Sequence, residues 1–356
     1  MLFCSLMQST NLFYRINDKL SHNYVLIYVL VSALALISFI SAVSFSQPAH
    51  VTIEPLSPIS WITAGVFNTT WLPIINGALL LFGLWLFFRS LLKRLSFLAL
   101  FLTLFTLAAS PFLYSFMFFD FSFNILFVAL SIFLFFFFKL DEKIKTPFTP
   151  PRKVVKYWLY YILALVVLLL SHIVFGWVAI ISLFIYFILT KRWLSVAISV
   201  PLLGFAWLIT LILSNFFAFG FDVYSISFQP ISVMVDGVTN FYFFSTLKQL
   251  TAKYIVFAFM VLLFIFQLFL LAIRNRAFLF VWIFIIVSFT LFALFTVNNS
   301  LDDRYLYLLL PYINAMFMIT VCQTIFKRNW ATLTAVISGV LFTAISLAVN
   351  VLGNWC

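Results

Sequence analysis

The side chains that could carry chemistry are few, and they lie at the ends of long apolar runs. Glu54 is the only acid between the first two such runs, and Asp120 stands alone between two later ones. A carboxylate with little water around it can act as a general base toward a hydroxyl or an amine. We predict catalytic roles for both residues. The alternatives are a solvated loop acid for Glu54 and a helix N-cap for Asp120.

A second group of side chains suits the binding of a phosphate. Arg304 follows two aspartates and precedes Tyr305, at the start of another apolar run. A guanidinium fits a phosphate well because it donates paired hydrogen bonds in a fixed geometry. Lys248 and His172 could add contacts to the same phosphate. The alternatives are an ion pair with the adjacent aspartates for Arg304 and a buried structural histidine for His172.

Other recognisable chemistry is missing from the sequence. It contains no P-loop, no H-E-x-x-H or G-x-S-x-G motif and no Cys/His cluster. The three cysteines, Cys4, Cys322 and Cys356, lack the spacing of metal ligands. We therefore predict no metal site and no cofactor, although a divalent ion remains compatible with the sequence.

The composition indicates which elements must position these residues. Of 356 residues, 65% are hydrophobic and only 8% are charged, and the mean hydropathy is +1.20. These are too few charges to cover a soluble domain. A bilayer core needs roughly 20 apolar residues for each helix that crosses it. We predict an all-α, polytopic membrane bundle, a single transmembrane domain over residues 1–356 with about eleven spanning helices. The predicted spans are 24–45, 72–88, 95–117, 121–138, 157–170, 177–189, 193–213, 254–273, 277–297, 305–325 and 331–351.

The basic residues predict the orientation of these helices. A single helix over residues 157–190 would be about 51 Å long, too long for one ordinary pass, so we divide it near 171–176. With this division, 17 of the 20 Lys and Arg residues fall on one side of the membrane. The positive-inside rule makes that side cytoplasmic, which predicts a cytoplasmic N-terminus and an extracytoplasmic C-terminus. Six of the nine acids fall on the opposite side, which favours a polar site there.

Two connections on the outer side are long. Residues 46–71 form the first external loop and end in an apolar stretch with Trp61 and Trp71, which predicts an interfacial helix. Residues 214–253 are rich in Phe and Tyr and form a second external interfacial segment. The net charge of +11 does not indicate a nucleic-acid partner, because the cations cluster at helix ends. The predicted surroundings are membrane lipids, in the cell membrane.

Three short patterns carry a resemblance to a known superfamily. Residues 54–56 read Glu-Pro-Leu and precede an apolar run that ends in Arg89. Asp120 follows Pro111 by nine residues and leads into a Phe/Leu-rich run. Arg304 and Tyr305 precede a proline, six residues past the tyrosine. Together these patterns resemble the polytopic GT-C glycosyltransferases, which include dolichyl-phosphate-mannose protein mannosyltransferases and lipid A aminoarabinose transferases.

The resemblance implies an enzyme that transfers a sugar from a polyprenyl-phosphate donor to a lipid, glycan or protein acceptor outside the membrane. By this resemblance Glu54 would be the base, Asp120 would organise the site and Arg304 would hold the phosphate. The chain departs from the family's pattern because residues 46–51 contain no acid. Either Glu54 substitutes for the family's first-loop acid, or the chain is a relative without transferase activity.

Two other functions fit a chain of this kind. A surface-polysaccharide polymerase of the O-antigen type also has many helices and external arginines, but it usually has a larger external loop with several basic residues. A transporter or flippase would need ionisable residues near mid-membrane and often has paired internal repeats. Neither feature is evident in the sequence.

Overall fold

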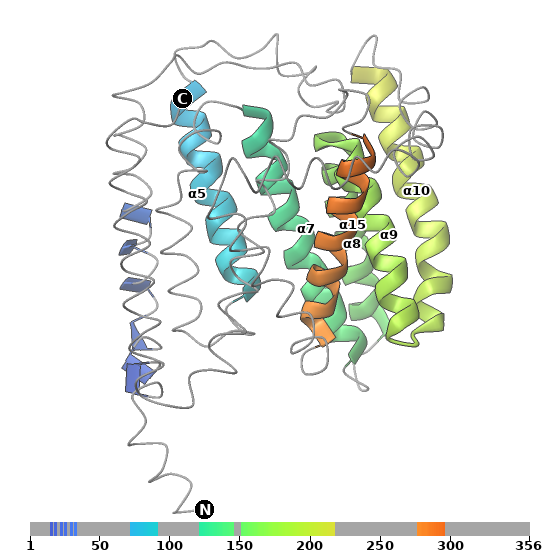
Figure 1. Ribbon diagram of the computed structural model, residues 1–356, viewed down its shortest axis with the longest axis horizontal. Coiled ribbons are helices and arrows are strands. Elements are labelled where there is room, and N and C mark those ends of the chain that lie inside the picture. The colour runs from blue at the N-terminus through green and yellow to red at the C-terminus, as the bar shows by residue number, and fades with distance from the viewer. Residues whose placement is uncertain are drawn as a thin grey trace, which may run out of the picture.

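The computed structural model describes residues 72–91, 121–145, 151–217 and 276–295, together with scattered positions between 15 and 33 (Figure 1). The four continuous ranges form six helices: α5 (Leu72–Leu91), α7 (Phe121–Lys145), α8 (Pro151–Ser171), α9 (Ile173–Leu189), α10 (Trp193–Phe217) and α15 (Arg276–Phe295). Within these ranges only residue 172 and the turn at 190–192 are not helical. The predicted all-α class is confirmed for this part of the chain.

Three of these helices contain stretches long and apolar enough to cross a membrane. The stretches are Asn124–Lys145, Val154–Ser171 and Trp193–Leu213, with mean hydropathies of 2.0, 2.0 and 2.4. Shorter apolar stretches occupy Ile74–Ser90, Ile173–Leu189 and Leu279–Ser288. Helices of this length and composition satisfy their own backbone hydrogen bonds in lipid. They indicate a helical membrane protein.

The helices α9 and α15 run in opposite directions. The Phe137 ring of α7 stacks on Phe280 near the start of α15, with 3.7 Å between ring centroids. The Phe175 ring at the start of α9 lies 6.4 Å from Phe284, one turn further along α15, while Tyr186 near the end of α9 lies 5.8 Å from Phe280. Because the order is reversed, α15 is antiparallel to α9.

The helices α8 and α9 form a hairpin with a single connecting residue. Trp158 near the start of α8 lies 6.1 Å from Phe187 near the end of α9, so the two helices are antiparallel. The connecting residue, His172, is extended, with φ −165° and ψ 116°. Gly176 permits the close approach, since a Cβ there would lie 2.6 Å from Cγ of Leu169. The predicted division of residues 157–190 near 171–176 is confirmed.

Aromatic side chains fill the space between α7, α8, α9 and α15. Tyr161, Tyr186, Phe133 and Phe137 are all 1% exposed or less. The Phe133 ring lies 5.2 Å from Tyr161, and Phe137 meets Tyr186 edge-on at 5.4 Å. Since lipid tails are as apolar as these side chains, close packing rather than exclusion of water holds such helices together. This aromatic core fixes the relative positions of the four helices.

Several predictions fall on other parts of the chain. The predicted spans 95–117, 254–273, 305–325 and 331–351 and most of 24–45 lie outside the described residues, as do the external segments 46–71 and all but the first residues of 214–253. The number of spans therefore stays a prediction, and so does the side of the membrane on which each terminus lies.

Candidate functional site

One of the six residues with a predicted role is in the described part of the chain. Glu54, Asp120, Lys248, Arg304 and Tyr305 lie outside it. His172 lies within it, at the turn between α8 and α9. Of the predicted roles, the phosphate contact of His172 is therefore the one that can be checked against the position of its residue in the described helices.

His172 is completely buried where the two helices of the hairpin meet. Its backbone N–H donates to the carbonyl of Leu168 at 2.9 Å, and its own carbonyl accepts from the N–H of Gly176 at 3.1 Å. Its ring meets Phe175 edge-on, with 5.4 Å between centroids. Complete burial favours the neutral imidazole, because the charged form would lose its solvation. A neutral His172 could donate a single hydrogen bond to a ligand but would add no positive charge.

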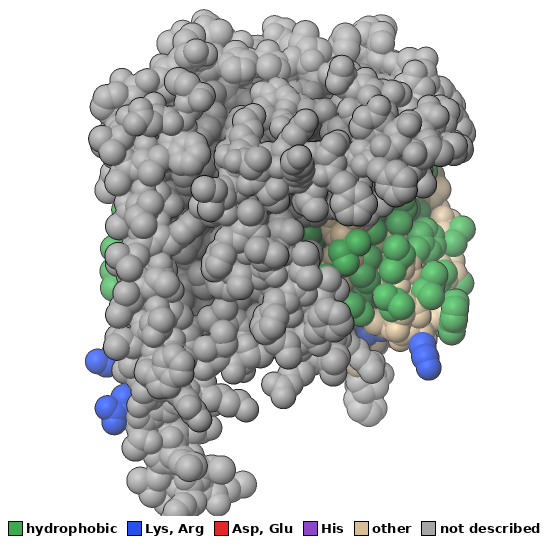
Figure 2. Space-filling view, in the orientation of Figure 1, with side chains coloured by type: hydrophobic (Ala, Val, Ile, Leu, Met, Phe, Trp, Pro, Cys, Tyr) green, Lys and Arg blue, Asp and Glu red, His purple; other side chains and the backbone are tan. Residues whose placement is uncertain are grey.

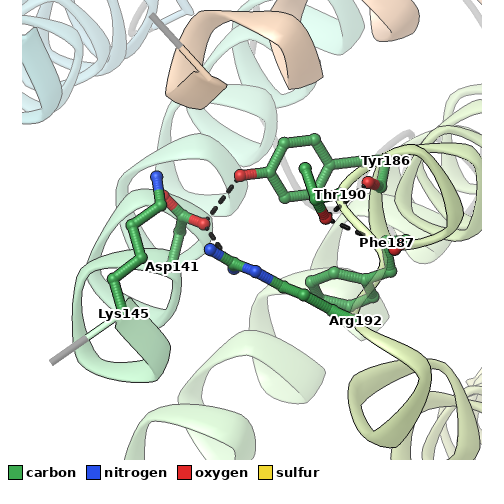
Figure 3. Close-up of polar contacts among 6 residues, drawn as sticks. All are labelled: Asp141, Lys145, Tyr186, Phe187, Thr190 and Arg192. Carbon is green, nitrogen blue, oxygen red and sulfur yellow. Dashed lines mark hydrogen bonds and ion pairs between the residues drawn. The ribbon is translucent and has the colours of Figure 1, made fainter. Parts of the chain in front are cut away.

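The described helices also contain a cluster of charged and polar side chains, at the opposite end of α9 from His172 (Figure 3). We call Asp141, Lys145, Tyr186 and Arg192 the Asp141 cluster. The hydroxyl of Tyr186 and Nη1 of Arg192 donate to Oδ1 of Asp141 at 2.7 and 2.8 Å. Nζ of Lys145 donates to Oδ2 at 2.6 Å. The cluster joins the last turns of α7 and α9 to the start of α10.

A helix cap places Arg192 in this cluster. Lys191 has φ 56°, in the left-handed region. The N–H of Lys191 donates to the carbonyl of Ile188 at 3.0 Å, and the N–H of Arg192 donates to that of Phe187 at 2.9 Å. This pair of bonds is the Schellman motif, which usually has glycine at the left-handed position. The cap satisfies the last carbonyls of α9 and turns the chain so that Arg192 reaches Asp141.

The charges in the Asp141 cluster explain how a carboxylate is tolerated between apolar helices. The side chain of Asp141 is 1% exposed, while those of Arg192 and Lys145 are 18% and 38% exposed. Two cations therefore offset one buried anion and still reach the surface of the bundle. Both carboxylate oxygens already accept charge-assisted hydrogen bonds, so Asp141 is poorly placed to accept a proton from a substrate. This arrangement holds three helices together.

The Asp141 cluster was not among the predicted sites. The spacing of Asp141 and Lys145 by four residues is a recognisable helical ion-pair signal. The pairing with Arg192 spans 51 residues and depends on the tertiary fold. Tyr186 lies in an apolar run, where its hydroxyl gives no indication of a partner. The Asp141–Lys145 pair could therefore be predicted from the sequence, whereas the contacts of Asp141 with Arg192 and Tyr186 could not.

The cluster marks one end of the described bundle, which we call the basic end. Here α7 and α9 end, and α8, α10 and α15 begin. The cations at this end include Lys143, Lys145, Arg152, Lys156 and Lys191. In Figure 2 the visible Lys and Arg side chains lie toward the lower part of the molecule. The predicted clustering of these cations on one side agrees with the directions of the described helices.

The other end of the bundle contains the turn at His172 and the start of α7. Asn124, in the first turn of α7, is completely buried. Within the described ranges, no group of three or more His, Cys, Asp or Glu side chains could hold a metal ion. The end opposite the basic end therefore contains at least two buried polar side chains, Asn124 and His172.

Comparison of the chain with protein-family models, with curated proteins and with solved structures finds no match.

Proposed function

We propose that the chain is a membrane glycosyltransferase that moves a sugar from a polyprenyl-phosphate donor to a lipid, glycan or protein acceptor. One observation carries the proposal: the directions of the described helices. At the end opposite the basic end, α7 begins and α15 ends. Asp120 is the residue before α7 in the sequence, and Arg304 follows the end of α15 by nine residues. In the sequence, a candidate acid thus precedes one helix and a candidate phosphate ligand follows another, and the two helix ends lie on the same side of the bundle, which supports a shared site there.

The proposed architecture has about eleven spanning helices, with the N-terminus in the cytoplasm and the active face outside the cell membrane. The buried Asn124 and His172 support a polar site on the outer side. Amide and imidazole groups are costly to hold among apolar helices, and such residues often mark a substrate site. Their positions at the end away from the basic end agree with an extracytoplasmic reaction.

The proposed reaction is a direct displacement at the anomeric carbon of the sugar. Glu54 takes the proton from the acceptor hydroxyl or amine as that atom attacks the carbon. The bond from the carbon to the phosphate oxygen breaks, and the configuration at the carbon inverts. Arg304, with Lys248 or with a hydrogen bond from the neutral His172, stabilises the negative charge that develops on the leaving polyprenyl phosphate. Asp120 and Tyr305 complete the proposed site.

The experiment that tests the function compares sugar transfer by wild-type protein and by the Glu54→Gln variant in membranes that contain polyprenyl-phosphate sugars. The amide is similar in size to the carboxylate but cannot take the proton. We expect transfer to fall by at least 100-fold, within the range that general bases contribute, about 10²–10⁴-fold. Glu142→Gln, which neutralises an acid at the basic end, is the matched control and should retain full activity.

Donor binding gives a second readout that is independent of turnover. Arg304→Ala should weaken binding of the polyprenyl-phosphate sugar by about tenfold or more, because a charge-assisted pair of hydrogen bonds is lost. Full transfer by Glu54→Gln would contradict the assigned base. Unchanged donor affinity in Arg304→Ala would contradict the assigned phosphate ligand. If the wild type binds none of the donors, the polymerase and transporter functions become the better hypotheses.

A further inference from the structure

The helices α8 and α10 each carry exposed apolar side chains on one face. On α8, Val155, Leu159 and Leu163 recur every four residues and are each more than half exposed. On α10 the exposed apolar side chains include Leu194, Ile198, Phe205, Leu208 and Ile212. Figure 2 shows apolar side chains on the right-hand side, where α10 lies in Figure 1, with basic side chains just below them. In a membrane protein such a surface faces the acyl chains of lipids.

Three exposed cations lie where this apolar surface meets the basic end. Arg152 precedes Val155 by three residues and Lys156 precedes Leu159 by three, so both cations lie on the apolar face of α8. Lys191, in the turn before α10, is also exposed. None of these three cations pairs with an acid of the described ranges. Lys145 and Arg192, by contrast, are already paired with Asp141.

The end of α9, which Lys191 follows by two residues, packs beside the first turns of α8. The backbone N–H of Arg192 donates to Phe187 at 2.9 Å, and the ring of Phe187 lies 6.1 Å from that of Trp158 in α8. The helices α8 and α10 are also in direct contact. Lys156 lies 5.5 Å from the centre of the Tyr160 ring. Tyrosine beside lysine is typical of the level of the membrane at which headgroups lie.

We propose that an anionic phospholipid binds at the basic end of the α8–α10 pair. Arg152, Lys156 and Lys191 hold the headgroup phosphate, and the acyl chains lie along the exposed apolar side chains of the two helices. A zwitterionic lipid has the same chains, but its headgroup brings its own positive charge. Cations that pair with no acid of the described ranges and lie next to exposed apolar side chains therefore favour the anionic lipid. This binding is independent of the proposed transfer reaction, which lies at the other end of the bundle.

Native mass spectrometry of the full chain in a neutral detergent tests the proposal. The protein is titrated with phosphatidylglycerol and with phosphatidylcholine of identical acyl chains. We expect the wild type to prefer phosphatidylglycerol, and R152Q/K156Q/K191G to lose that preference. Each cation near a charged lipid surface contributes about fivefold to affinity, so the expected loss is on the order of 100-fold. Glycine is chosen at position 191 because it tolerates the left-handed backbone.

The matched control is R15Q/K19Q/R89Q, which removes three exposed cations away from the α8–α10 face. It should keep the preference for phosphatidylglycerol. An equal loss in the two triple variants would overturn the proposal in favour of unspecific attraction, as would equal binding of the two lipids to the wild type. Displacement of the lipid by an equal concentration of soluble glycerol phosphate would also overturn it, because the site would then bind free phosphate. If the triple variant does not fold, Arg152→Gln alone should show the fivefold loss, and an unchanged affinity would overturn the proposal.

Discussion

The Asp141 carboxylate is stable between apolar helices because three side chains from α7, α9 and the following turn donate to it. Removing one member of a buried ion pair is costly, since the remaining charge stays behind without a counter-charge. Asp141 is the member shared by both ion pairs. Its loss should therefore affect the bundle more than the loss of either cation alone.

Asp141→Ala should reduce the free energy of unfolding by about 2–3 kcal/mol. The expected loss is smaller than the range of about 3–5 kcal/mol for a fully buried pair, because Arg192 and Lys145 still reach the surface. Thermal unfolding in detergent, followed by tryptophan fluorescence, measures the change. Glu142→Ala removes the same charge one residue further along and should change stability by less than about 1 kcal/mol.

A double variant separates the ion pair from the packing of the side chains. Asp141→Ala/Arg192→Ala should be less destabilised than the sum of the two single variants, because neither charge is left without its partner. Strict additivity would show that Asp141 and Arg192 act independently and would contradict the structural role given to the pair.

At the residue scale, a local interaction leaves a signal in the sequence that a long-range one lacks, although no part of the Asp141 cluster was among the predicted sites. The four-residue spacing of Asp141 and Lys145 was available in the sequence, whereas the contact with Arg192 was not. The left-handed backbone of Lys191 was also unpredictable, because glycine is the usual signal for that cap. Of the predicted site residues, His172 is the one whose surroundings are described, and its burial agrees with the alternative of a buried structural histidine.

At the scale of helices, two glycines differ in the space that surrounds them. Gly176 lies where α9 meets α8, and an added Cβ would lie 3.1 Å from the backbone Cα of Leu169. Gly204 faces open space in α10, with no atom within 4 Å of an added Cβ. The first glycine is required by the packing of two helices, and the second is not.

Gly176→Ala should destabilise the protein by about 1–3 kcal/mol, because the methyl group meets a neighbouring backbone that cannot move away. Gly204→Ala should be neutral or stabilise by up to about 1 kcal/mol, since alanine favours the helix. The free energies of unfolding of the two variants are compared by titration with a denaturing detergent. Equal effects at both positions would contradict the tight α8–α9 contact.

The predicted spans located the described helices but not always their ends. The predicted span 121–138 corresponds to α7, which continues to Lys145, and the predicted span 157–170 corresponds to α8, which already begins at Pro151. Apolar runs mark the part of a helix that lies in lipid, whereas charged residues with good helix propensity extend it beyond the bilayer core. Proline suits the first helical position, which explains the early start of α8.

At the scale of the whole molecule, the helix directions place the ends of α7 and α9 at one end of the described bundle and the end of α10 at the other. Charge distribution predicts that the first of these ends faces the cytoplasm. The relative directions of α7, α8, α9 and α10 were predictable because the basic residues at their ends can be read from the sequence; the side of the membrane stays a prediction. The packing of aromatic rings that fixes the helices against one another was not predictable.

Truncated fusions test the orientation directly. Green fluorescent protein fused after Lys145 or Arg192 should fluoresce, and alkaline phosphatase fused after Phe217 should be active, because these reporters mature on opposite sides of a bacterial inner membrane. As controls, alkaline phosphatase is fused after Lys145 and Arg192, and green fluorescent protein is fused after Phe217. Opposite locations for the fusions at Lys145 and Arg192 would contradict the α8–α9 hairpin, and inversion of all three would reverse the predicted orientation.

The single-residue connection at His172 has a consequence for biosynthesis. No hydrophilic loop separates α8 from α9. During synthesis there is therefore no connecting segment that water could solvate on the far side of the membrane before α9 is complete. The two helices should therefore leave the insertion machinery together, as one unit that begins and ends on the same side of the bilayer. We expect the nascent chain to be extended through the whole of α9 before either helix of the pair reaches its final depth.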